Sequence, residues 1–466
     1  MADGSTSGNA APLRPIPGPR GLAKWRSIGQ LARRPHEFYL ELARSYGDIV
    51  LLDFPLETVV LLAHPAYIEH VLHHNYRNYV KQTGRWRTMR QIWGNGLVMS
   101  DGDFWRRQRQ RIQPAFHQAR VDAHLGLFVE EAGATRAAWE TAARQGETRD
   151  VYRDMRACSL RALTRAMFGS DVAGKTEGIT TALDAIHAYV NPVSLMSLID
   201  APAFVRRLLT RGYARFEAGL RYLNETFDDI LRRRREGDQT AADLLGLFMV
   251  ATDEEVAEVM NHQELHDEMM VILMAGHETT AVAAGWACYF ISRAPEVERR
   301  LHAEIDAVLG DRRPTLDDIR KLTYTHMVIE ETLRLCPPIY AFDRQAVDDD
   351  VVDGYRIPRG ATVGISPYAM HHHPKYWDRP DEFDPDRFDP NRSATRPDYA
   401  FFPFGGGPRR CIGYRFAMLE VTALLATLGR RVRLEYLPDH PVTPKLRLNF
   451  TPSPGIQMRI HARPHA

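Results

Sequence analysis

The sequence predicts a mainly α-helical fold with a minor β-sheet region. The helical prediction rests on windows that are rich in Ala, Leu, Arg and Glu and repeat their apolar residues at helical spacing. These windows are residues 122–144, 154–169, 213–236, 264–293, 296–309 and 413–431. The β prediction rests on two apolar, β-prone runs, residues 48–53 and 58–63, which a turn containing Pro55 joins into a hairpin.

The chain is expected to fold as one domain behind a flexible leader. Residues 1–24 are rich in Pro, Gly, Ser and Ala and lack the apolar core of a signal peptide or membrane anchor, so we expect a flexible leader there. After residue 339 the composition changes to Pro, Asp and Gly, with short β-prone pieces at 355–358 and 361–364. No polar linker or fixed repeat divides the rest, so residues 25–466 are predicted to form a single domain.

Composition argues against several classes of protein. The 466 residues carry 60 Lys plus Arg against 59 Asp plus Glu, which leaves no global field to attract nucleic acid or an anionic membrane. The four cysteines lie far apart without a CxxC pair, so neither a zinc site nor a disulfide framework is indicated, and a reducing cytoplasm fits best. The long apolar run at 264–294 contains Asp267, Glu268 and Glu278, so it is predicted to be a buried helix and not a membrane span.

Two polar runs receive structural interpretations. The run from Arg232 to Arg235 closes a helical pattern, where cations favour the negative end of the helix dipole. It is therefore interpreted as a solvated helix end and not as a nucleic-acid contact. The run from His371 to His373 is interpreted as a polar loop, because adjacent side chains diverge along the backbone and do not easily converge on one metal ion.

The strongest chemical signal is the segment FGGGPRRCIG, from Phe404 to Gly413, directly before a predicted helix. Its glycines permit a tight backbone close to a flat ligand, and the N–H groups at the helix start can stabilise a thiolate at Cys411. Arg409 can pair with a carboxylate. A lone cysteine beside a helix is more often a small buried apolar residue, so Cys411 gains its interest from these surroundings.

A second segment, AGHETT at 275–280, lies inside the predicted helix at 264–293. Small Ala275 and Gly276 can leave room beside a ligand, while Glu278 and Thr279 can supply transferable protons. An alternative stays open at this point. Thr279 can instead bond back to the carbonyl one turn earlier and bend the helix, with Glu278 merely on a polar face.

The segment at 404–413 matches the haem-binding loop of the cytochrome P-450 family, and the chain resembles that family in four motifs in the expected order. The match holds at Phe404, Gly407, Arg409, Cys411 and Gly413. The resemblance implies the family's fold, with a long central helix over a buried haem b. It assigns Cys411 as the axial thiolate ligand of the iron, a ligand that favours O–O cleavage.

The same resemblance gives roles to other residues. The segment at 275–280 resembles the oxygen-binding helix, with Ala275 and Gly276 beside the haem and Glu278 and Thr279 as a proton relay. Three further residues resemble positions that bind the haem propionates, a task that suits forked arginine hydrogen bonds. They are Trp105, Arg109 and Arg344.

Glu331 and Arg334 stand three residues apart on a predicted helix and so share a face on which they can pair. Taken alone, they would be an exposed pair of little energetic value. With Arg387 they resemble the family's buried Glu-Arg-Arg network beneath the haem loop, which implies a structural and not a catalytic role.

The resemblance implies a monooxygenase that inserts one oxygen atom of O2 into an apolar organic substrate. No flavin or nicotinamide domain follows the haem loop, so a separate ferredoxin or flavodoxin with its reductase is expected to supply electrons to a monomeric, cytoplasmic enzyme. Alternatives are a peroxide-using or rearranging haem-thiolate enzyme and a non-catalytic haem sensor or ligand carrier. Glu278 and Thr279 argue against both, because neither alternative requires a proton relay.

The expected substrate pocket is apolar and aromatic and shows no diagnostic polar anchor, so a fatty acid, terpenoid, steroid or polyketide would each fit. Its candidate lining residues are Trp86, Met89, Ile92, Trp93, Leu97, Ile339, Tyr340, Ala341 and Phe342. Arg107, Arg111 and Arg410 are expected on the face nearest Cys411, where they would attract an acidic electron donor.

Overall fold

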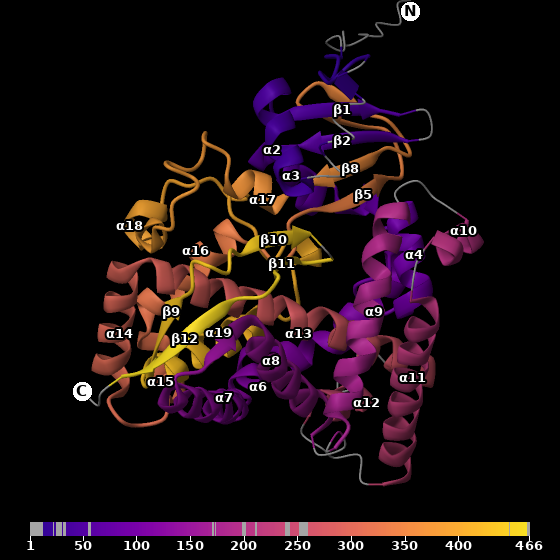
Figure 1. Cartoon of the computed structure of the whole chain (residues 1–466). Helices are drawn as coiled ribbons and strands as arrows, with labels where there is room; N and C mark the ends of the chain where they lie inside the picture. The colour runs from indigo at the N-terminus through magenta and orange to yellow at the C-terminus, as the bar shows by residue number, and fades with distance from the viewer. Residues whose placement is uncertain are drawn as a thin grey trace, which may run out of the picture.

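The protein combines a β-rich part with a larger helical part, and Figure 1 shows the two beside each other. The structure is a computed structural model. It describes residues 13–463 apart from residues 22, 25–29, 31–33, 55–56, 170–171, 173, 198–201, 210–211, 238–242, 251–259 and 447. The β-rich part joins strands from the start of the chain to strands that follow residue 340. The predicted class, mainly α with a minor sheet, is confirmed.

The main sheet has five strands in the order β1-β2-β8-β5-β3. They are β1 (Ile49–Asp53), β2 (Thr58–Leu62), β8 (Thr362–Ile365), β5 (Phe342–Ala346) and β3 (Tyr79–Val80). β1 and β2 pair antiparallel and confirm the predicted hairpin, whereas β2 and β8 pair in parallel. Branched side chains favour such strands, and Val60, Val363 and Ile365 are completely buried, so one core of the molecule lies on this sheet.

Residues 13–20 belong to the β-rich part, which corrects the expectation that the leader extends to residue 24. The amide of Arg14 donates to the Gly354 carbonyl over 2.8 Å, and its guanidinium donates to the Tyr355 hydroxyl over 2.7 Å. The amide of Leu51 donates to the Pro17 carbonyl over 2.8 Å. The residue pattern did not reveal this anchoring, because the partners lie far away in the sequence.

Every helical window predicted from the sequence lies in a helix of the structure, to within three residues at either end. The helices are α2 (Pro35–Tyr46), α3 (Pro65–Glu69), α4 (Gly84–Trp93), α5 (Gly102–Ile112), α6 (Gln118–Asp122), α7 (Leu125–Gln145), α8 (Val151–Phe168), α9 (Thr176–Ser197), α10 (Ala203–Leu209), α11 (Tyr213–Glu236), α12 (Leu244–Met249), α13 (His262–Arg293), α14 (Pro295–Leu309), α15 (Leu316–Lys321), α16 (Thr323–Leu335), α17 (Pro367–His371), α18 (Pro390–Ser393) and α19 (Tyr414–Gly429).

The longest of these helices, α13, runs through the helical part. It has 32 residues, which corresponds to about 48 Å at the usual rise per residue. Asn261 caps it, because the Asn261 side chain accepts the Glu264 amide while the Glu264 carboxylate accepts the Asn261 amide. Helices α8, α11, α16 and α19 pack against it. The long central helix implied by the family resemblance is therefore present.

Smaller sheets complete the β structure of the described residues. β4 (Thr148–Asp150), β12 (Gln457–Ala462) and β9 (Val432–Tyr436) form one sheet, while β6 (Asp350–Val352) pairs with β7 (Tyr355–Ile357) and β10 (Thr443–Leu446) with β11 (Phe450–Ser453). Within the described ranges, none of the helices has the length and apolarity that crossing a membrane requires.

The two polar runs depart from their interpretations to different extents. α11 ends at Glu236 and Arg232, Arg233 and Arg235 are exposed, as predicted. Arg234 is the exception, since it is buried, donates to the Phe168 carbonyl over 3.0 Å and pairs with Asp243. His371 is also buried, at the end of α17, and its Nε2 accepts the Phe402 amide over 3.0 Å. Distant segments cover both runs, which local composition cannot reveal. No cluster of metal-ligating side chains occurs in the part of the chain that the structure describes.

A buried ion-pair network joins α16 to the chain that follows it. Glu331 lies 2.7 Å from Arg334 and 3.4 Å from Arg387, nitrogen to oxygen. The Arg334 guanidinium also donates to the carbonyls of His371 and Pro380, over 2.9 and 2.7 Å. All three charged side chains are buried, so the structure brings together the residues that the resemblance groups into one network.

Replacing Arg334 with alanine is expected to lower the free energy of unfolding by about 3–5 kcal/mol, because Glu331 stays buried with one partner fewer. Guanidinium denaturation followed by circular dichroism measures the loss. Arg356→Ala is the matched control, since Arg356 pairs with Asp349 on the surface and such pairs contribute about 1 kcal/mol or less. Equal losses in the two variants would contradict the structural role of the network.

Candidate active site

The segment from Phe404 to Gly413 forms a loop that leads into the N-terminus of α19. A single 3-10 turn, Gly407–Arg409, precedes Cys411, and the Cys411 amide donates to the Phe404 carbonyl over 2.9 Å. The Cys411 side chain is exposed. The other cysteines of the chain are buried: Cys158, Cys288 and Cys336. The loop thus presents an accessible thiol at a helix start.

Gly407 must be glycine for two reasons. Its φ of 62° lies in the left-handed region, and a Cβ atom there would lie 1.9 Å from the Leu72 carbonyl oxygen. The loop therefore packs directly on the backbone of the segment His70–His74. The family match at this position has a steric basis, because any side chain would push the loop and Cys411 out of place.

The surroundings of Cys411 act in opposite directions on its thiol. Desolvation is the largest effect and raises the pKa of Cys411 above its ordinary value, although the Gly413 amide, Arg109 and Arg410 act to lower it. These three groups favour the thiolate, which is the form that binds metals. Desolvation raises the pKa of the buried thiol of Cys288 to about 12. Accessibility and thiolate-stabilising neighbours together make Cys411 the cysteine suited to a ligand role.

Helix α5 braces the cysteine loop. The Arg109 guanidinium donates to the Arg410 carbonyl over 3.1 Å, next to Cys411. Trp105 is buried, and the Arg409 guanidinium carbon lies 4.2 Å from the centroid of its ring. Arg409 also donates to the Asp101 carboxylate over 2.7 Å, which confirms the predicted pairing with a carboxylate. The loop and α5 therefore hold each other through stacking and charge-assisted hydrogen bonds.

Two buried cations lie close to Arg409. Arg344, on β5, is 7% exposed, and desolvation together with Arg409 lowers its pKa to about 10. Lys81 is also 7% exposed and donates to the Val98 carbonyl over 2.6 Å. Desolvation, with Arg344 and Arg409, lowers the pKa of Lys81 well below its ordinary value. Sequence reasoning missed Lys81, because no motif or spacing marks it.

Burial is the main cause of both lowered pKa values, and the neighbouring cations add to it. The carboxylate of Asp101 accepts from Arg409 and from the Lys81 amide, so it is already engaged. The Arg344 guanidinium donates to the Asp343 carbonyl over 2.7 Å, which satisfies a donor without neutralising the charge. An anionic ligand at this place would therefore be stabilised by cations that the fold has already desolvated.

Helix α13 is open along one stripe. Ala275 is exposed and Ile272, Gly276 and Thr279 are partly exposed, although most of the helix is buried. Spacings of three and four residues place them on one face. The Thr279 hydroxyl donates to the Ala275 carbonyl over 2.7 Å, so the bond back to the preceding turn that the sequence left open is present. The Thr279 hydroxyl donates only one hydrogen bond, so its oxygen can still accept one from a group on the open side of the helix.

Glu278 lies about 100° around the helix from Thr279. Its carboxylate oxygens lie 2.6 Å from His187 Nδ1 on α9 and 3.2 Å from the Tyr152 hydroxyl on α8. Burial acts to raise the pKa of Glu278, but the contacts with His187, His277 and Arg156 outweigh it and hold the pKa well below its usual range. The alternative that Glu278 merely lies on a polar face is wrong, because the side chain is buried. The side chains of Glu278 and Thr279 do not point toward each other.

The expected pocket residues fall into two segments. Residues 86–97 lie on α4 and the loop after it, which packs on α13, and residues 339–342 lead into β5. Met89, Leu97 and Ala341 are buried. The others are partly exposed: Trp86, Ile92, Trp93, Ile339, Tyr340 and Phe342. Their assignment to a substrate pocket stays a prediction.

The expectation about the arginines near Cys411 needs one correction. The Arg111 side chain is only 6% exposed and lies 3.4 Å from the Glu264 carboxylate. It faces the start of α13, so it cannot contact a docked protein. Arg107 and Arg410 are exposed, as expected.

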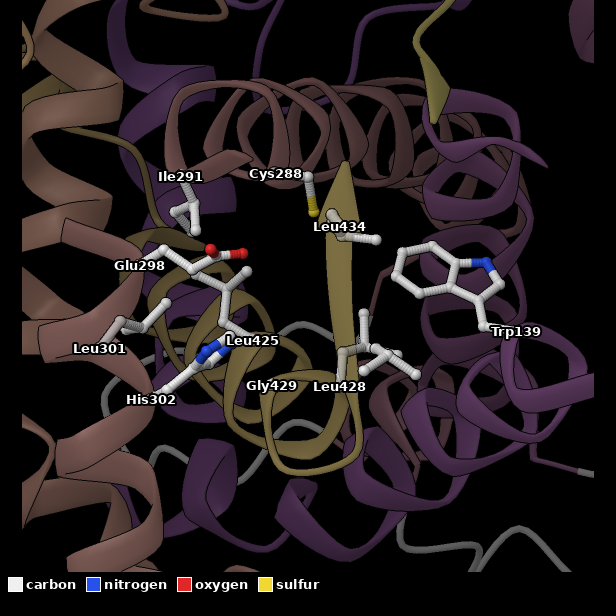
Figure 2. Close-up of a pocket in the computed structure, with 11 residues that line it drawn as sticks. Trp139, Cys288, Ile291, Glu298, Leu301, His302, Leu425, Leu428, Gly429 and Leu434 are labelled. Carbon is white, nitrogen blue, oxygen red and sulfur yellow. The ribbon is translucent and has the colours of Figure 1, made fainter. Parts of the chain in front are cut away.

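Figure 2 shows a separate small cavity of about 30 Å³ near the end of α19. It is lined by Trp139, Cys288, Ile291, Glu298, Leu301, His302, Leu425, Leu428, Gly429, Val432 and Leu434. Leu425 stands 14 residues after Cys411, which corresponds to about 20 Å along a helix. Ligand sites have volumes of about 300 Å³ or more, so this cavity has room for little more than water.

The accessible thiol, the buried cations beside the cysteine loop and the open stripe of α13 are the features that the resemblance assigns to a haem site. Comparison with known proteins agrees. The family model for cytochrome P450 matches residues 16–460. The chain belongs to the cytochrome P450 family of haem-thiolate monooxygenases.

Individual relatives extend over nearly the whole chain. Cyclooctatin synthase of Streptomyces melanosporofaciens is 36% identical over 91% of this chain and 91% of its own. Pentalenene oxygenase of Streptomyces avermitilis is 32% identical over 93% of this chain and 94% of its own. The crystal structure of the cytochrome P450DA heme domain matches with a TM-score of 0.86 and 27% identity, over 97% of this chain and 99% of that chain. The resemblance drawn from the motifs is confirmed.

The residues present fit a haem. Cys411 offers sulfur on the open side of the loop, and exposed Ala275 leaves space on α13. Gly276 instead faces α8, because a Cβ there would lie 2.8 Å from the Leu163 side chain. Arg344 and Lys81 supply the desolvated positive charge that two propionate groups need.

Arg344→Leu is expected to release haem about ten to a hundred times faster than the unaltered protein, because hydrogen bonds to charged groups contribute about 1.5–3 kcal/mol. Transfer of haem to excess apomyoglobin, followed in the Soret band, measures the rate. Arg356→Leu, at the surface, is the control. An unchanged rate in Arg344→Leu would show that Arg344 does not hold the cofactor.

Proposed function

We propose that this monooxygenase inserts one oxygen atom of O2 into a terpenoid, by hydroxylation or epoxidation. The observation that carries the proposal is the similarity to cyclooctatin synthase and pentalenene oxygenase over more than nine-tenths of the chain. The apolar and aromatic character of the predicted pocket supports it, because terpenoids offer large apolar surfaces and few polar groups. Among the classes that the sequence left open, terpenoids are the one these relatives favour.

We infer that the cofactor is haem b and that the Cys411 thiolate would bind its iron. When bound, the haem supplies the activation of O2 and the insertion chemistry. Three groups of residues would hold it. From the cysteine loop these are Phe404, Gly407, Arg409 and Gly413, and from α13 they are Ala275 and Gly276. Arg344, Arg109 and Trp105 complete the set.

Proton handling falls to Thr279 and Glu278. The Thr279 hydroxyl donates its proton to the Ala275 carbonyl, so its oxygen would accept a hydrogen bond on the open side of α13. Glu278 holds its charge against His187 and Tyr152 on another face. A proton passes from this cluster to the Thr279 side through a water molecule or a change of the Glu278 rotamer.

Electrons come from a separate ferredoxin or flavodoxin with its reductase. Arg107 and Arg410 are exposed beside the cysteine loop and suit an acidic partner, whose encounter they would accelerate. With such a donor system, we expect the enzyme to work in the cytoplasm.

The test of the proposed function is turnover of a terpenoid panel by the holoenzyme with ferredoxin, its reductase, NADPH and 18O2. One 18O atom is expected in the product. Cys411→Ser is expected to lose both turnover and the thiolate-specific Soret band of the reduced carbon monoxide complex, because only a sulfur ligand gives that band. Cys336→Ser is the matched control and should keep the band. Persistence of the band in Cys411→Ser would refute the ligand assignment.

The same assay separates the alternatives. A peroxide-using or rearranging enzyme would form product without O2 and reductant. A haem sensor or ligand carrier would bind terpenoids without converting them.

Thr279→Ala is expected to bind haem and substrate normally but to convert less of the consumed NADPH into product, with hydrogen peroxide released instead. The reason is that the variant removes a hydrogen-bond acceptor from the open face of α13. A loss of coupling of about tenfold corresponds to one such interaction. Product formed per NADPH consumed is the measurement. Coupling equal to that of the unaltered enzyme would remove Thr279 from the mechanism.

A further inference from the structure

His187 on α9 is a buried histidine that contacts Glu278, the acid of the proposed proton relay. Its Nδ1 lies 2.6 Å from Glu278 Oε2, and both side chains are buried. The imidazole is not aligned for a hydrogen bond, but such contacts in active sites are often poorly aligned until the substrate is bound. The distance itself is short enough for a proton to pass between the two residues.

The two ring nitrogens of His187 have different surroundings. Nδ1, which faces Glu278, is enclosed by the protein. Nε2 makes no hydrogen bond within the described residues and is not enclosed there, and 6% of the residue's surface stays exposed. Water can therefore reach one side of the ring while Glu278 contacts the other. An imidazole in such a position can take up a proton at one nitrogen and release one from the other.

Polar side chains connect this histidine to the surface. Asp184 stands three residues before His187 on α9, so the two share one face of the helix. The Asp184 side chain is exposed and pairs with Arg156 on α8 over 2.5 Å. Arg156 also lies close enough to Glu278 to act on its pKa. The junction of α8 and α9 is therefore polar from the surface down to Glu278.

The other groups around Glu278 are less suited to carry protons at neutral pH. Arg156 does not give up its proton in a protein. The Tyr152 hydroxyl, which donates to Glu278 Oε1 over 3.2 Å, is a weak acid. Desolvation lowers the pKa of His277 to about 4, although Glu278 opposes this effect. Histidine is the side chain that ordinarily gains and loses a proton near neutral pH, so His187 is the group suited to this task.

We propose that His187 supplies the protons that Glu278 passes toward the open face of α13. Water protonates Nε2, the Nδ1–H bond breaks, and the released proton forms an O–H bond at Glu278 Oε2. Glu278 passes this proton on and regains its charge, and His187 turns about its Cβ–Cγ bond to present an N–H group again. Insertion of one oxygen atom of O2 consumes two electrons and two protons and releases one water molecule, so this cycle runs twice in each turnover.

This inference rests on the proposed function, and it distinguishes two ways of driving the same oxidation. With O2 and reductant, both protons come from water through His187. With hydrogen peroxide in place of O2 and reductant, the oxidant already contains both protons, and none is needed from outside. His187 acts through Glu278 and does not itself contact the substrate, so it should matter for the first reaction and not for the second.

The test is the substitution His187→Gln in the holoenzyme, with the terpenoid of the panel that turns over fastest. The glutamine amide can still donate a hydrogen bond to Glu278 but cannot gain or lose a proton at neutral pH. Product formation with ferredoxin, its reductase, NADPH and O2 is expected to fall by about tenfold or more, because a positioned proton donor is lost and water replaces it only in part. The peroxide-supported rate is expected to stay unchanged.

A second readout needs no variant. Because only protonated His187 can supply a proton, the ratio of the O2-supported to the peroxide-supported rate of the unaltered enzyme is expected to fall as the pH rises through the range in which histidine loses its proton. His187→Gln is expected to lose that fall. A residue that merely supported the fold would leave the pH dependence of this ratio as it is.

His302→Gln is the matched control, because His302 on α14 is also largely covered but lines the separate small cavity near the end of α19. It should leave both rates unchanged. The Soret band of the reduced carbon monoxide complex shows that each variant is folded around its haem. His187→Asn replaces His187→Gln if the longer amide prevents this.

The outcomes separate this inference from the proposed function. Equal loss of both rates in His187→Gln would show a structural role, and an unchanged O2-supported rate would show that protons arrive by another route. Either result would overturn the role of His187 and leave terpenoid oxidation standing. Failure of the unaltered enzyme to oxidise any terpenoid of the panel with O2 would count against the proposed function itself.

Discussion

The burial of α13 is the constraint on which the rest of the site depends. A helix of 32 residues that neighbouring helices cover along most of its length has few places where a ligand can approach it. The stripe from Ile272 to Thr279 is such a place, and exposed Ala275 in it would let a ligand come close to the backbone. The stripe is therefore the part of α13 that is available to a ligand bound by the cysteine loop and the buried cations. Their own positions follow from contacts with α5, β5 and the segment near Leu72.

The polar residues of α13 divide the helix into faces with different tasks. Glu278 couples α13 to α8 and α9 through Tyr152 and His187. Thr279 and Ile272 belong to the face with the stripe. Successive residues of a helix point 100° apart, so the side chains of sequence neighbours contact different parts of the protein. Residues two turns apart lie on the same face of the helix. This explains why an acid and an alcohol that are adjacent in the sequence are not in contact.

Sequence reasoning succeeded where the signal is local. Helical periodicity located the main helices, and the Cys411 loop was recognisable because its glycines, arginine and cysteine stand in one short segment. It failed where packing against distant segments determines whether a side chain is buried. Arg111 and Arg234 look like solvated cations in the sequence, yet the fold covers both side chains and pairs each with a carboxylate.

Residues outside recognisable motifs were also beyond prediction. Lys81 has no neighbour pattern that marks it, and its importance comes from lying near Arg344, which is far away in the chain. His187 received no role, because nothing in the local sequence shows that α9 brings it to Glu278. Both residues became visible through burial and through contacts with distant residues.

The topology of the main sheet has a consequence for how the chain is made. β2 pairs in parallel with β8, which joins Leu62 to Ile365 across 303 residues. At a synthesis rate of about 5–20 residues per second, the N-terminal hairpin waits roughly 15–60 s before its partner strand leaves the ribosome. During that interval the edge of β2 is open to wrong pairing with other chains. The yield of folded enzyme in a foreign host therefore depends on protecting this one strand edge during translation, whatever the stability of the finished molecule.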